Sequence, residues 1–464
     1  MRCVRAVRRG FFPLDEELQL LAGHYTPTLY EGMTRLSTWM PFERAVKEVG
    51  YFLHTQVTEA TVRRQTETAG AAYVAVQTHE VERLEHELPP APQGPAKLFM
   101  SVDGAFVPLV GGEWAEVKTL ALGEVEAPKQ VKGELVIQTR ALSYFSRLTD
   151  ATTFQRLALV ETHRRGVETA SDVGAVTDGA AWCQGFVDFH RPGATRILDF
   201  PHAGEHVAQI GQAVFGEGTA TTDTWFTQQL HDLKHDGPTP VLAEIHHLAA
   251  DHPDLTRLAE PVAYLDKRKD QMQYPVFQAA GWPIGDGAVE SANKLVVEAR
   301  LKGSGMHWAR PHVDPMLALR NLACNDRWDE GWAQIVAELR RQTRLRSMTR
   351  CQQRRARCEA QPVLSRQTAP ASSDVVPQTE AALASAPVPA PPAKPMPDQP
   401  KEPRRPAPDH PWRPSPIGRA RYQPTTHAKR TFPIIRGNCL NERVALYSGL
   451  TTGTRNEPPH FSGC

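Results

Sequence analysis

The sequence predicts a mixed α/β protein in which α-helices come first, a helical insertion divides the sheet-forming part, and a tail follows. Helical spacing of apolar residues dominates 1–88, whereas short apolar strands separated by turns dominate 96–202. Helical spacing returns in 203–280 and 281–335. Of the 39 prolines, 16 fall between Pro362 and Pro416, where large apolar residues are few. We therefore expect 336–464 to be a basic and then proline-rich disordered tail.

The N-terminal region contains a pattern typical of DNA-reading proteins. The spacing predicts a helix over Pro41–Leu53, then a short turn, then a second helix that Thr58 caps and Gly70 closes. The second helix carries Arg63 and Arg64. Helix, tight turn and helix is the helix-turn-helix arrangement, although an ordinary helical hairpin fits the pattern equally well. We interpret 1–88 as a helical, helix-turn-helix-like DNA-binding region.

A third helix, Ala71–Leu88, is expected to lead into a succession of strands. The predicted order is three strands, a helix, a strand, a helix and a strand, with the strands at Lys97–Asp103, Trp114–Leu122, Leu135–Leu142, Val173–Asp178 and Thr195–Asp199. This order fits an RNase H-like mixed sheet, in which the first strand lies beside the fourth. Asp103 and Asp178 would then emerge at one sheet edge, although 178 − 103 = 75 positions separate them.

A third carboxylate is expected near that edge. Residues 281–300 form a glycine-containing turn and then a helix whose predicted apolar stripe is Val289, Ala292, Leu295, Val296 and Ala299. Glu290 lies in its first turn and can point toward the sheet. Each acid also has a plainer interpretation: Asp-Gly is a common turn signal, and a first-turn glutamate stabilises the helix dipole.

Three carboxylates with no thiol and no nucleophile motif favour hard divalent metals over covalent catalysis. Mg²⁺ and Mn²⁺ prefer oxygen ligands, and two such ions can activate a water or a 3′-hydroxyl while stabilising the leaving oxygen. Asp103, Asp178 and Glu290 are therefore predicted to hold two Mg²⁺ or Mn²⁺ ions for phosphodiester chemistry.

Charge is unevenly distributed along the chain. The net charge of +1 neither favours nor excludes nucleic acid, but eight arginines and no acidic residue lie between Arg340 and Arg357. Such a run suits phosphate contact, because neutralised phosphates release counterions. It fits a solvated, unstructured basic arm equally well.

Several protein classes are disfavoured by the sequence. The seven cysteines are scattered without a Cys-x-x-Cys pair, which argues against a disulfide framework or a zinc ribbon. His202 and His206 have a spacing that can bind zinc, but no third ligand of a hydrolase signature accompanies them. The first residues, MRCVRAVRRGFFPLDEEL, lack the apolar core of a signal peptide, and no apolar run is long enough to span a membrane. We expect a cytoplasmic protein.

Four stretches resemble a known family: VDGAFV (102–107), VTDGAAW (176–182), ILDFPHAGEHV (197–207) and GDGAVESANKLVVEARLKGSGMHW (285–308). They are similar to bacterial insertion-sequence transposases of the Mutator-like DDE superfamily, closest to the Kra-type insertion sequences, and the resemblance covers about residues 11–325. It implies a DDE triad of Asp103, Asp178 and Glu290, and it matches Asp199 and His202 to an accessory motif. The separation 290 − 178 = 112 suits the helical insertion of such enzymes.

The resemblance implies a transposase that cleaves DNA at the ends of its element and transfers the strands to a target. Its partners would be terminal inverted repeats and target DNA, and holding two ends implies a homodimer or larger assembly near the bacterial nucleoid. Lys294, Arg300 and Lys302, which follow Glu290, are expected either to bind phosphate or to be ordinary surface charge. Two departures stand out: relatives often carry a cysteine-rich segment where only Cys3 occurs here, and the tail beyond about Trp332 has no recognised counterpart. The alternatives are a catalytically inactive DNA-binding remnant and a stand-alone RNase H-like nuclease.

Overall fold

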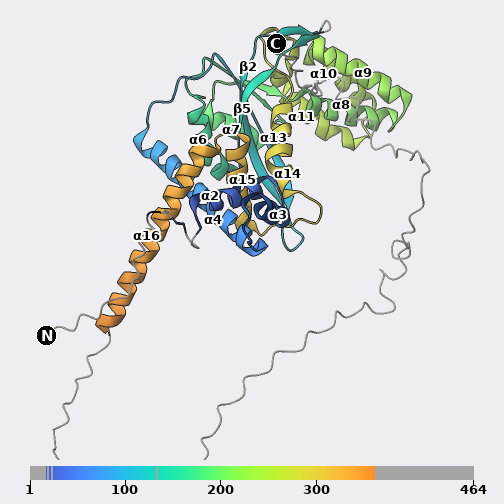
Figure 1. Cartoon of the computed structure of the whole chain (residues 1–464). Coiled ribbons are helices and arrows are strands. Elements are labelled where there is room, and N and C mark those ends of the chain that lie inside the picture. The colour runs from blue at the N-terminus through green and yellow to red at the C-terminus, as the bar shows by residue number, and fades with distance from the viewer. Residues whose placement is uncertain (1–16, 18–19, 22–24, 132–133, 361–464) are drawn as a thin grey trace, which may run out of the picture. The chain divides into compact units, whose positions relative to one another are not determined.

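The computed structural model describes residues 17, 20–21, 25–131 and 134–360 (Figure 1). The described residues up to Ala356 belong to one compact unit. It has a mixed α/β architecture: N-terminal helices, a five-stranded mixed sheet and a helical region after it. The expectations for the proline-rich part of the tail, 361–464, lie outside the described residues.

The N-terminal helices are α2 (Pro27–Trp39), α3 (Phe42–Leu53) and α4 (Glu59–Glu87). Thr58 caps α4 as predicted, its hydroxyl accepting the Thr61 N–H at 3.2 Å. The predicted end of this helix at Gly70 is wrong, because α4 continues through it as one helix of 29 residues. A Cβ at Gly70 would lie 2.2 Å from the backbone oxygen of Pro315. The glycine therefore permits a close contact between helices and does not end one.

The five-stranded sheet has the order β5-β2-β1-β6-β7. Its strands are β1 (Lys97–Pro108), β2 (Trp114–Val125), β5 (Thr139–Arg147), β6 (Asp172–Thr177) and β7 (Thr195–Leu198). Strand β1 pairs antiparallel with β2 and parallel with β6. The predicted neighbourhood of the first and fourth strands is therefore confirmed.

Two strand boundaries differ from the prediction. The first strand does not end at Asp103, because β1 continues to Pro108 in a long hairpin with β2, where Asp103 lies opposite Thr119. The strand expected at 135–142 is replaced by a short hairpin, β3 (Lys129–Val131) with β4 (Glu134–Val136), followed by β5. Alternation of apolar and polar residues cannot distinguish one strand from two that a short turn separates.

Helices cover both faces of the sheet. On one face, Met100, Val102 and Phe145 pack against α5 (Ala151–Leu157) and α7 (Ala181–His190), with α6 (Leu159–Arg164) between these helices in sequence. The other face packs against α13 (Gly287–Ala292), a π-helical segment (Asn293–Glu298), α14 (Ala299–Leu301) and α15 (Arg310–Cys324). As predicted, Asp150 caps α5, and its carboxylate accepts the Thr153 N–H at 2.9 Å.

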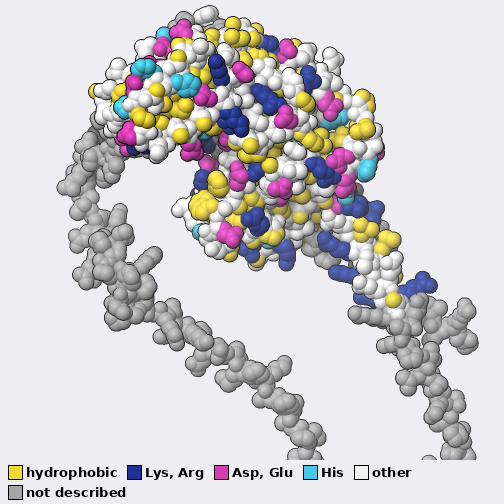
Figure 2. Space-filling model, turned by 180° about the vertical axis from the view of Figure 1, so that it is seen from behind, with side chains coloured by type: hydrophobic (Ala, Val, Ile, Leu, Met, Phe, Trp, Pro, Cys, Tyr) yellow, Lys and Arg dark blue, Asp and Glu magenta, His cyan; other side chains and the backbone are white. Residues whose placement is uncertain are grey.

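The last described helix, α16 (Trp328–Ala360), is 33 residues long. The prediction of a disordered tail beginning at residue 336 is wrong for 336–360, which are helical. Arginine is a good helix former and the stretch contains neither proline nor glycine, so composition alone does not prevent the helix from continuing. Basic side chains lie along its exposed part, seen from behind in Figure 2.

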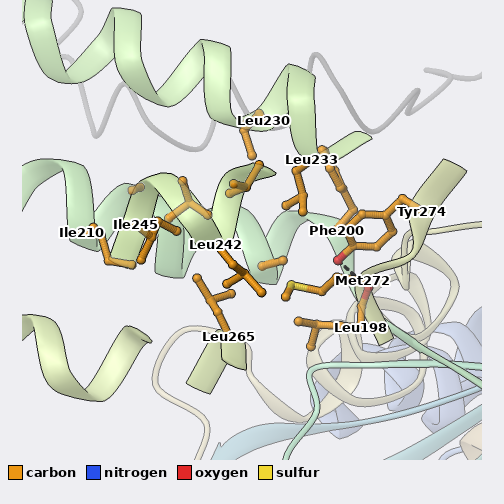
Figure 3. Packing of buried hydrophobic residues seen from close by; sticks show 14 of the residues in the cluster. Leu198, Phe200, Ile210, Leu230, Leu233, Leu242, Ile245, Leu265, Met272 and Tyr274 are labelled. Atoms are coloured by element: carbon orange, nitrogen blue, oxygen red, sulfur yellow. Dashed lines mark hydrogen bonds between the residues drawn. The ribbon is translucent and has the colours of Figure 1, made fainter. Parts of the chain in front are cut away.

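The predicted helical region is confirmed and contains α8 (Phe200–Phe215), α9 (Ala220–His235), α10 (Pro238–Asp251), α11 (Ala259–Lys267) and α12 (Tyr274–Ala279). Two short 3₁₀ turns, Thr256–Leu258 and Lys269–Met272, flank α11. Figure 3 shows the apolar core of this region, where Leu230, Leu242 and Leu265 converge. Tyr274 closes the core at the sheet end by donating a hydrogen bond to the Leu198 carbonyl at 3.0 Å.

Candidate active site

The sheet brings Asp103 and Asp178 to the same edge. The parallel ladder between β1 and β6 runs from Lys97 to Met100 on β1, and β6 ends at Thr177. Asp178 directly follows the end of β6, and Asp103 lies on β1 three residues after the last residue of the ladder. Because these strands are parallel, both acids lie beyond the same end of their shared ladder, although β1 itself continues to Pro108.

Asp103 is partly buried in an acidic environment. Burial, together with the smaller effects of the Asp178 and Glu290 carboxylates, raises the pKa of Asp103 to about 6. The Gly104 N–H and the side-chain amide of Asn293, which donates at 2.7 Å, act in the opposite direction. The three acids therefore interact electrostatically.

Asp178 is held by a tight turn. One carboxylate oxygen accepts the Ala180 N–H at 2.8 Å and lies 3.2 Å from the thiol sulfur of Cys183. Burial and the Asp178 charge raise the pKa of the Cys183 thiol far above its usual range, so this cysteine donates a hydrogen bond and is not a nucleophile. The following residue, Gly179, has a φ of +74°, which glycine adopts without strain.

The helical region reaches this turn through two side chains. The Tyr264 hydroxyl on α11 donates to the Asp178 carbonyl, and the Arg268 Nε donates to the Gly179 carbonyl at 3.1 Å. The Arg268 guanidinium also stacks over the Tyr264 ring, 3.7 Å from its centre. The backbone that carries Asp178 is thus fixed from a segment more than 80 positions away. Nothing in the local sequence indicated these contacts.

Glu290 lies in the first turn of α13, as predicted. Its side chain is exposed and lies 3.9 Å from the ammonium nitrogen of Lys294. Among the described residues, no three Asp, Glu, His or Cys side chains are close enough together to hold one metal ion as they stand. The structure therefore brings the three predicted acids to one region without joining them in one coordination cluster.

The helix that carries Glu290 widens directly after it. A π-helical segment begins at Asn293, and π turns are frequently found at functional sites. Asn293 is buried, and its side-chain oxygen has no hydrogen-bond partner. The predicted apolar stripe left this residue out and placed Leu295 and Ala299 on the buried face, although both are exposed. The buried face instead continues from Val289 at ordinary helical spacing through Ala292, Asn293, Val296, Val297 and Arg300.

Asp199 is the N-cap of α8, and it meets an acid that the sequence analysis missed. Its carboxylate accepts the N–H of His202 at 2.8 Å and that of Asp286 at 2.9 Å. Burial raises the pKa of Asp199 to about 6. Burial and the nearby carboxylates of Asp199 and Glu290 raise the pKa of Asp286 well above its usual range. The two buried acids together can therefore retain a proton near neutral pH.

The histidines at the start of α8 have ordinary partners. His202 lies 3.5 Å from Glu205, and this carboxylate raises the pKa of His202. The His206 ring stacks on Tyr264, with 3.8 Å between ring centres, and burial lowers the pKa of His206 to about 4. His206 therefore remains neutral at physiological pH.

The predicted DNA-contacting residues have different environments. Arg63, Arg64, Lys294 and Lys302 are exposed. Arg300 is not, and both interpretations offered for it are corrected: it is 2% exposed, and its guanidinium lies over the rings of Phe42 and Trp308. Its Nε donates to the Ser37 carbonyl at 2.8 Å. An arginine enclosed by aromatic rings cannot contact phosphate from this position.

No protein-family model and no curated protein matches the chain. In the part of the chain that the structure describes, no helix has the length and apolar character needed to cross a membrane.

Proposed function

We propose that this protein is a DDE transposase that cleaves DNA at the ends of its insertion sequence and joins them to target DNA. The observation that carries the proposal is that Asp103 and Asp178 lie beyond the same end of the parallel ladder between β1 and β6, with Asp178 and Glu290 both near enough to raise the pKa of Asp103. The strand order and the helical region between Asp178 and Glu290 favour an RNase H-like core with an insertion. The family resemblance independently points to the same three acids.

The chemistry of the donor atoms suits Mg²⁺ or Mn²⁺. Three carboxylates and the unpartnered amide oxygen of Asn293 are hard oxygen ligands in a region with excess negative charge. Asp103, Asp178 and Glu290 would hold the ions, and Glu290 would first have to turn away from Lys294. Bound ions supply the activation of water or a 3′-hydroxyl and the stabilisation of the leaving oxygen.

The surrounding residues position these ligands. Asn293 holds one Asp103 oxygen, and Cys183 and the Ala180 N–H hold one oxygen of Asp178. Tyr264 and Arg268 fix the turn that carries Asp178. Arg63 and Arg64, which are exposed near the start of α4, offer a surface for the phosphates of the DNA ends. Because two ends must be held at once, the working form would be a dimer or larger assembly.

The test is metal-dependent nicking of a labelled duplex that carries the terminal repeat flanking the gene. Asp178→Asn should lower the nicking rate by about 100-fold or more, because it removes a charged ligand. The matched control is Asp172→Asn, which makes the same change on an exposed residue at the opposite end of β6 and should leave the rate unchanged.

Equal nicking by Asp178→Asn and the unmodified chain would refute the proposed triad. A chain that binds the repeat but never nicks it would be the inactive DNA-binding remnant. Cleavage without any joined product would instead favour a stand-alone nuclease.

A further inference from the structure

Helix α16 has two parts that differ in burial. Its first turns pack into the core through Trp328, Trp332, Ile335 and Leu339. After Leu339 no side chain is buried as far as Ala356, the last residue of the helix whose side chain is described. This second part, residues 341–356, is called the arginine arm below (Figure 1).

Several arginines of the arm lack the carboxylate partners that some exposed helical arginines have. Arg83 pairs with Glu80 and Arg156 with Glu85, and Arg341 at the start of the arm pairs with Glu338. No Asp or Glu occurs between Arg340 and Arg357. Within the described part of the chain, no carboxylate pairs with Arg344, Arg350 or Arg354. The positive charge of these three arginines is therefore not neutralised by a neighbouring carboxylate.

Three arginines form a row along the arm. Arg346, Arg350 and Arg354 are spaced four residues apart and so lie on one side of the helix, in line with Gln342, whereas Arg344 lies farther round the helix. Leu345, Thr349, Gln352 and Ala356 form a side that has no basic residue. Figure 2 shows basic side chains along this helix. A row of positive charge along an exposed helix matches a linear polyanion better than a general solvated surface.

The row is unfavourable for the isolated helix. Like charges at i and i+4 destabilise a helix, and the arm has no buried side chain that would offset this cost. From Arg344 to Arg354 the helix rises about 15 Å, and duplex DNA carries about nine phosphate charges over that length of axis. Bound to a duplex, the arginines would be attracted to the phosphates, which would offset their repulsion of one another.

We propose that the arginine arm of α16 binds the phosphate backbone of double-stranded DNA. The contact is independent of base sequence, because guanidinium–phosphate pairing reads charge and not base edges. The inference rests on the proposed function only for its choice of duplex DNA as the partner, and it needs no cleavage chemistry. It adds to the transposase a surface that would hold flanking or target DNA, whose sequence varies.

The experiment measures the affinity of the full chain for a 30-base-pair duplex of random sequence, in EDTA, between 50 and 200 mM salt. Replacing Arg344, Arg346, Arg350 and Arg354 with glutamine should lower the slope of log affinity against log salt by about 2 to 3, since each phosphate contact contributes about 0.9. Affinity at 150 mM salt should fall about tenfold or more. The matched control places lysine at the same four positions and should retain the slope.

Glutamine is also a good helix former, and these side chains are exposed, so the thermal unfolding midpoint should not change. Helical circular dichroism of the unmodified chain should increase when duplex is added. An unchanged salt slope in the glutamine variant would overturn the inference. A glutamine variant that loses binding to phosphatidylserine vesicles but keeps its affinity for duplex DNA would also overturn the inference. Nicking is assayed separately: a lowered slope in a chain that never nicks would refute the proposed function and leave this inference intact.

Discussion

Asp103 shows how a candidate catalytic side chain weakens the fold that contains it. Burial and the nearby acids raise its pKa from 3.8 to about 6. At neutral pH the carboxylate is ionised in both the folded and the unfolded chain, and the charge is less favourable in the folded chain. An acid whose folded pKa is raised therefore destabilises the fold above that pKa, and the cost disappears as the pH falls toward the unfolded pKa.

Asp103→Asn should accordingly stabilise the metal-free protein at pH 7.5. The shift corresponds to at most about 3 kcal/mol, and partial solvent access reduces the expected gain to about 1–2 kcal/mol. The difference in the free energy of unfolding between Asp103→Asn and the unmodified chain should shrink as the pH falls from about 6 to 4. Urea unfolding of both proteins in EDTA at several pH values measures it.

Mg²⁺ provides the complementary measurement at the same residue. Saturating Mg²⁺ should raise the unfolding midpoint of the unmodified chain, because a ligand that binds only the folded state stabilises it. Asp103→Asn should lose most of this increase, and the exposed Asp172→Asn should keep it. An equal increase in all three proteins would place the bound ion elsewhere.

At the scale of single elements, two helical glycines show how their surroundings decide the effect of the same substitution. Gly50 in α3 and Gly70 in α4 both lie inside helices, where alanine is intrinsically preferred. A Cβ at Gly50 would meet nothing within 4 Å, whereas at Gly70 it would overlap the Pro315 backbone of α15. Backbone atoms cannot move aside as a flexible side chain can.

Gly50→Ala should therefore stabilise the protein by about 0.5–1 kcal/mol. Gly70→Ala should destabilise it by about 1–3 kcal/mol, because the helices must separate. Urea unfolding midpoints at pH 7 compare the two variants. A stabilising effect at Gly70 would mean that α4 and α15 do not pack this closely in solution.

At the scale of the whole molecule, a distant helix completes the sheet. Strand β5 is at the sheet edge, where backbone groups lack a neighbouring strand. Asn325, directly after α15, supplies the hydrogen bonds that a neighbouring strand would make. Its side-chain oxygen accepts the Tyr144 N–H at 2.7 Å, and its side-chain nitrogen donates to the Tyr144 carbonyl at 2.9 Å. Asp314 similarly accepts the Leu148 N–H at 2.7 Å.

Asn325→Ala should destabilise the protein by about 2–3 kcal/mol, since it leaves both backbone groups of Tyr144 without a partner in a partly buried position. Asn325→Asp keeps the acceptor for the N–H but places a carboxylate against the carbonyl, so it should not restore stability. Thermal unfolding of the two variants measures this. Full stability of the alanine variant would show that water satisfies the strand edge.

The features that the sequence predicted correctly depend on neighbouring residues. Caps such as Thr58 and Asp150 bond to backbone groups three positions away, and the strand at 172–177 shows a compact apolar run. The adjacency of Asp103 and Asp178 was also predictable, because strand order restricts a mixed sheet to few arrangements.

Tertiary contacts decided the rest. The role of Gly70 depends on Pro315, and the burial of Arg300 depends on Phe42. The surroundings of Asp178 depend on Tyr264 and Arg268. Hydrophobic spacing and capping report the preferences of a segment by itself, whereas close packing, burial and pKa depend on which distant segment lies against it.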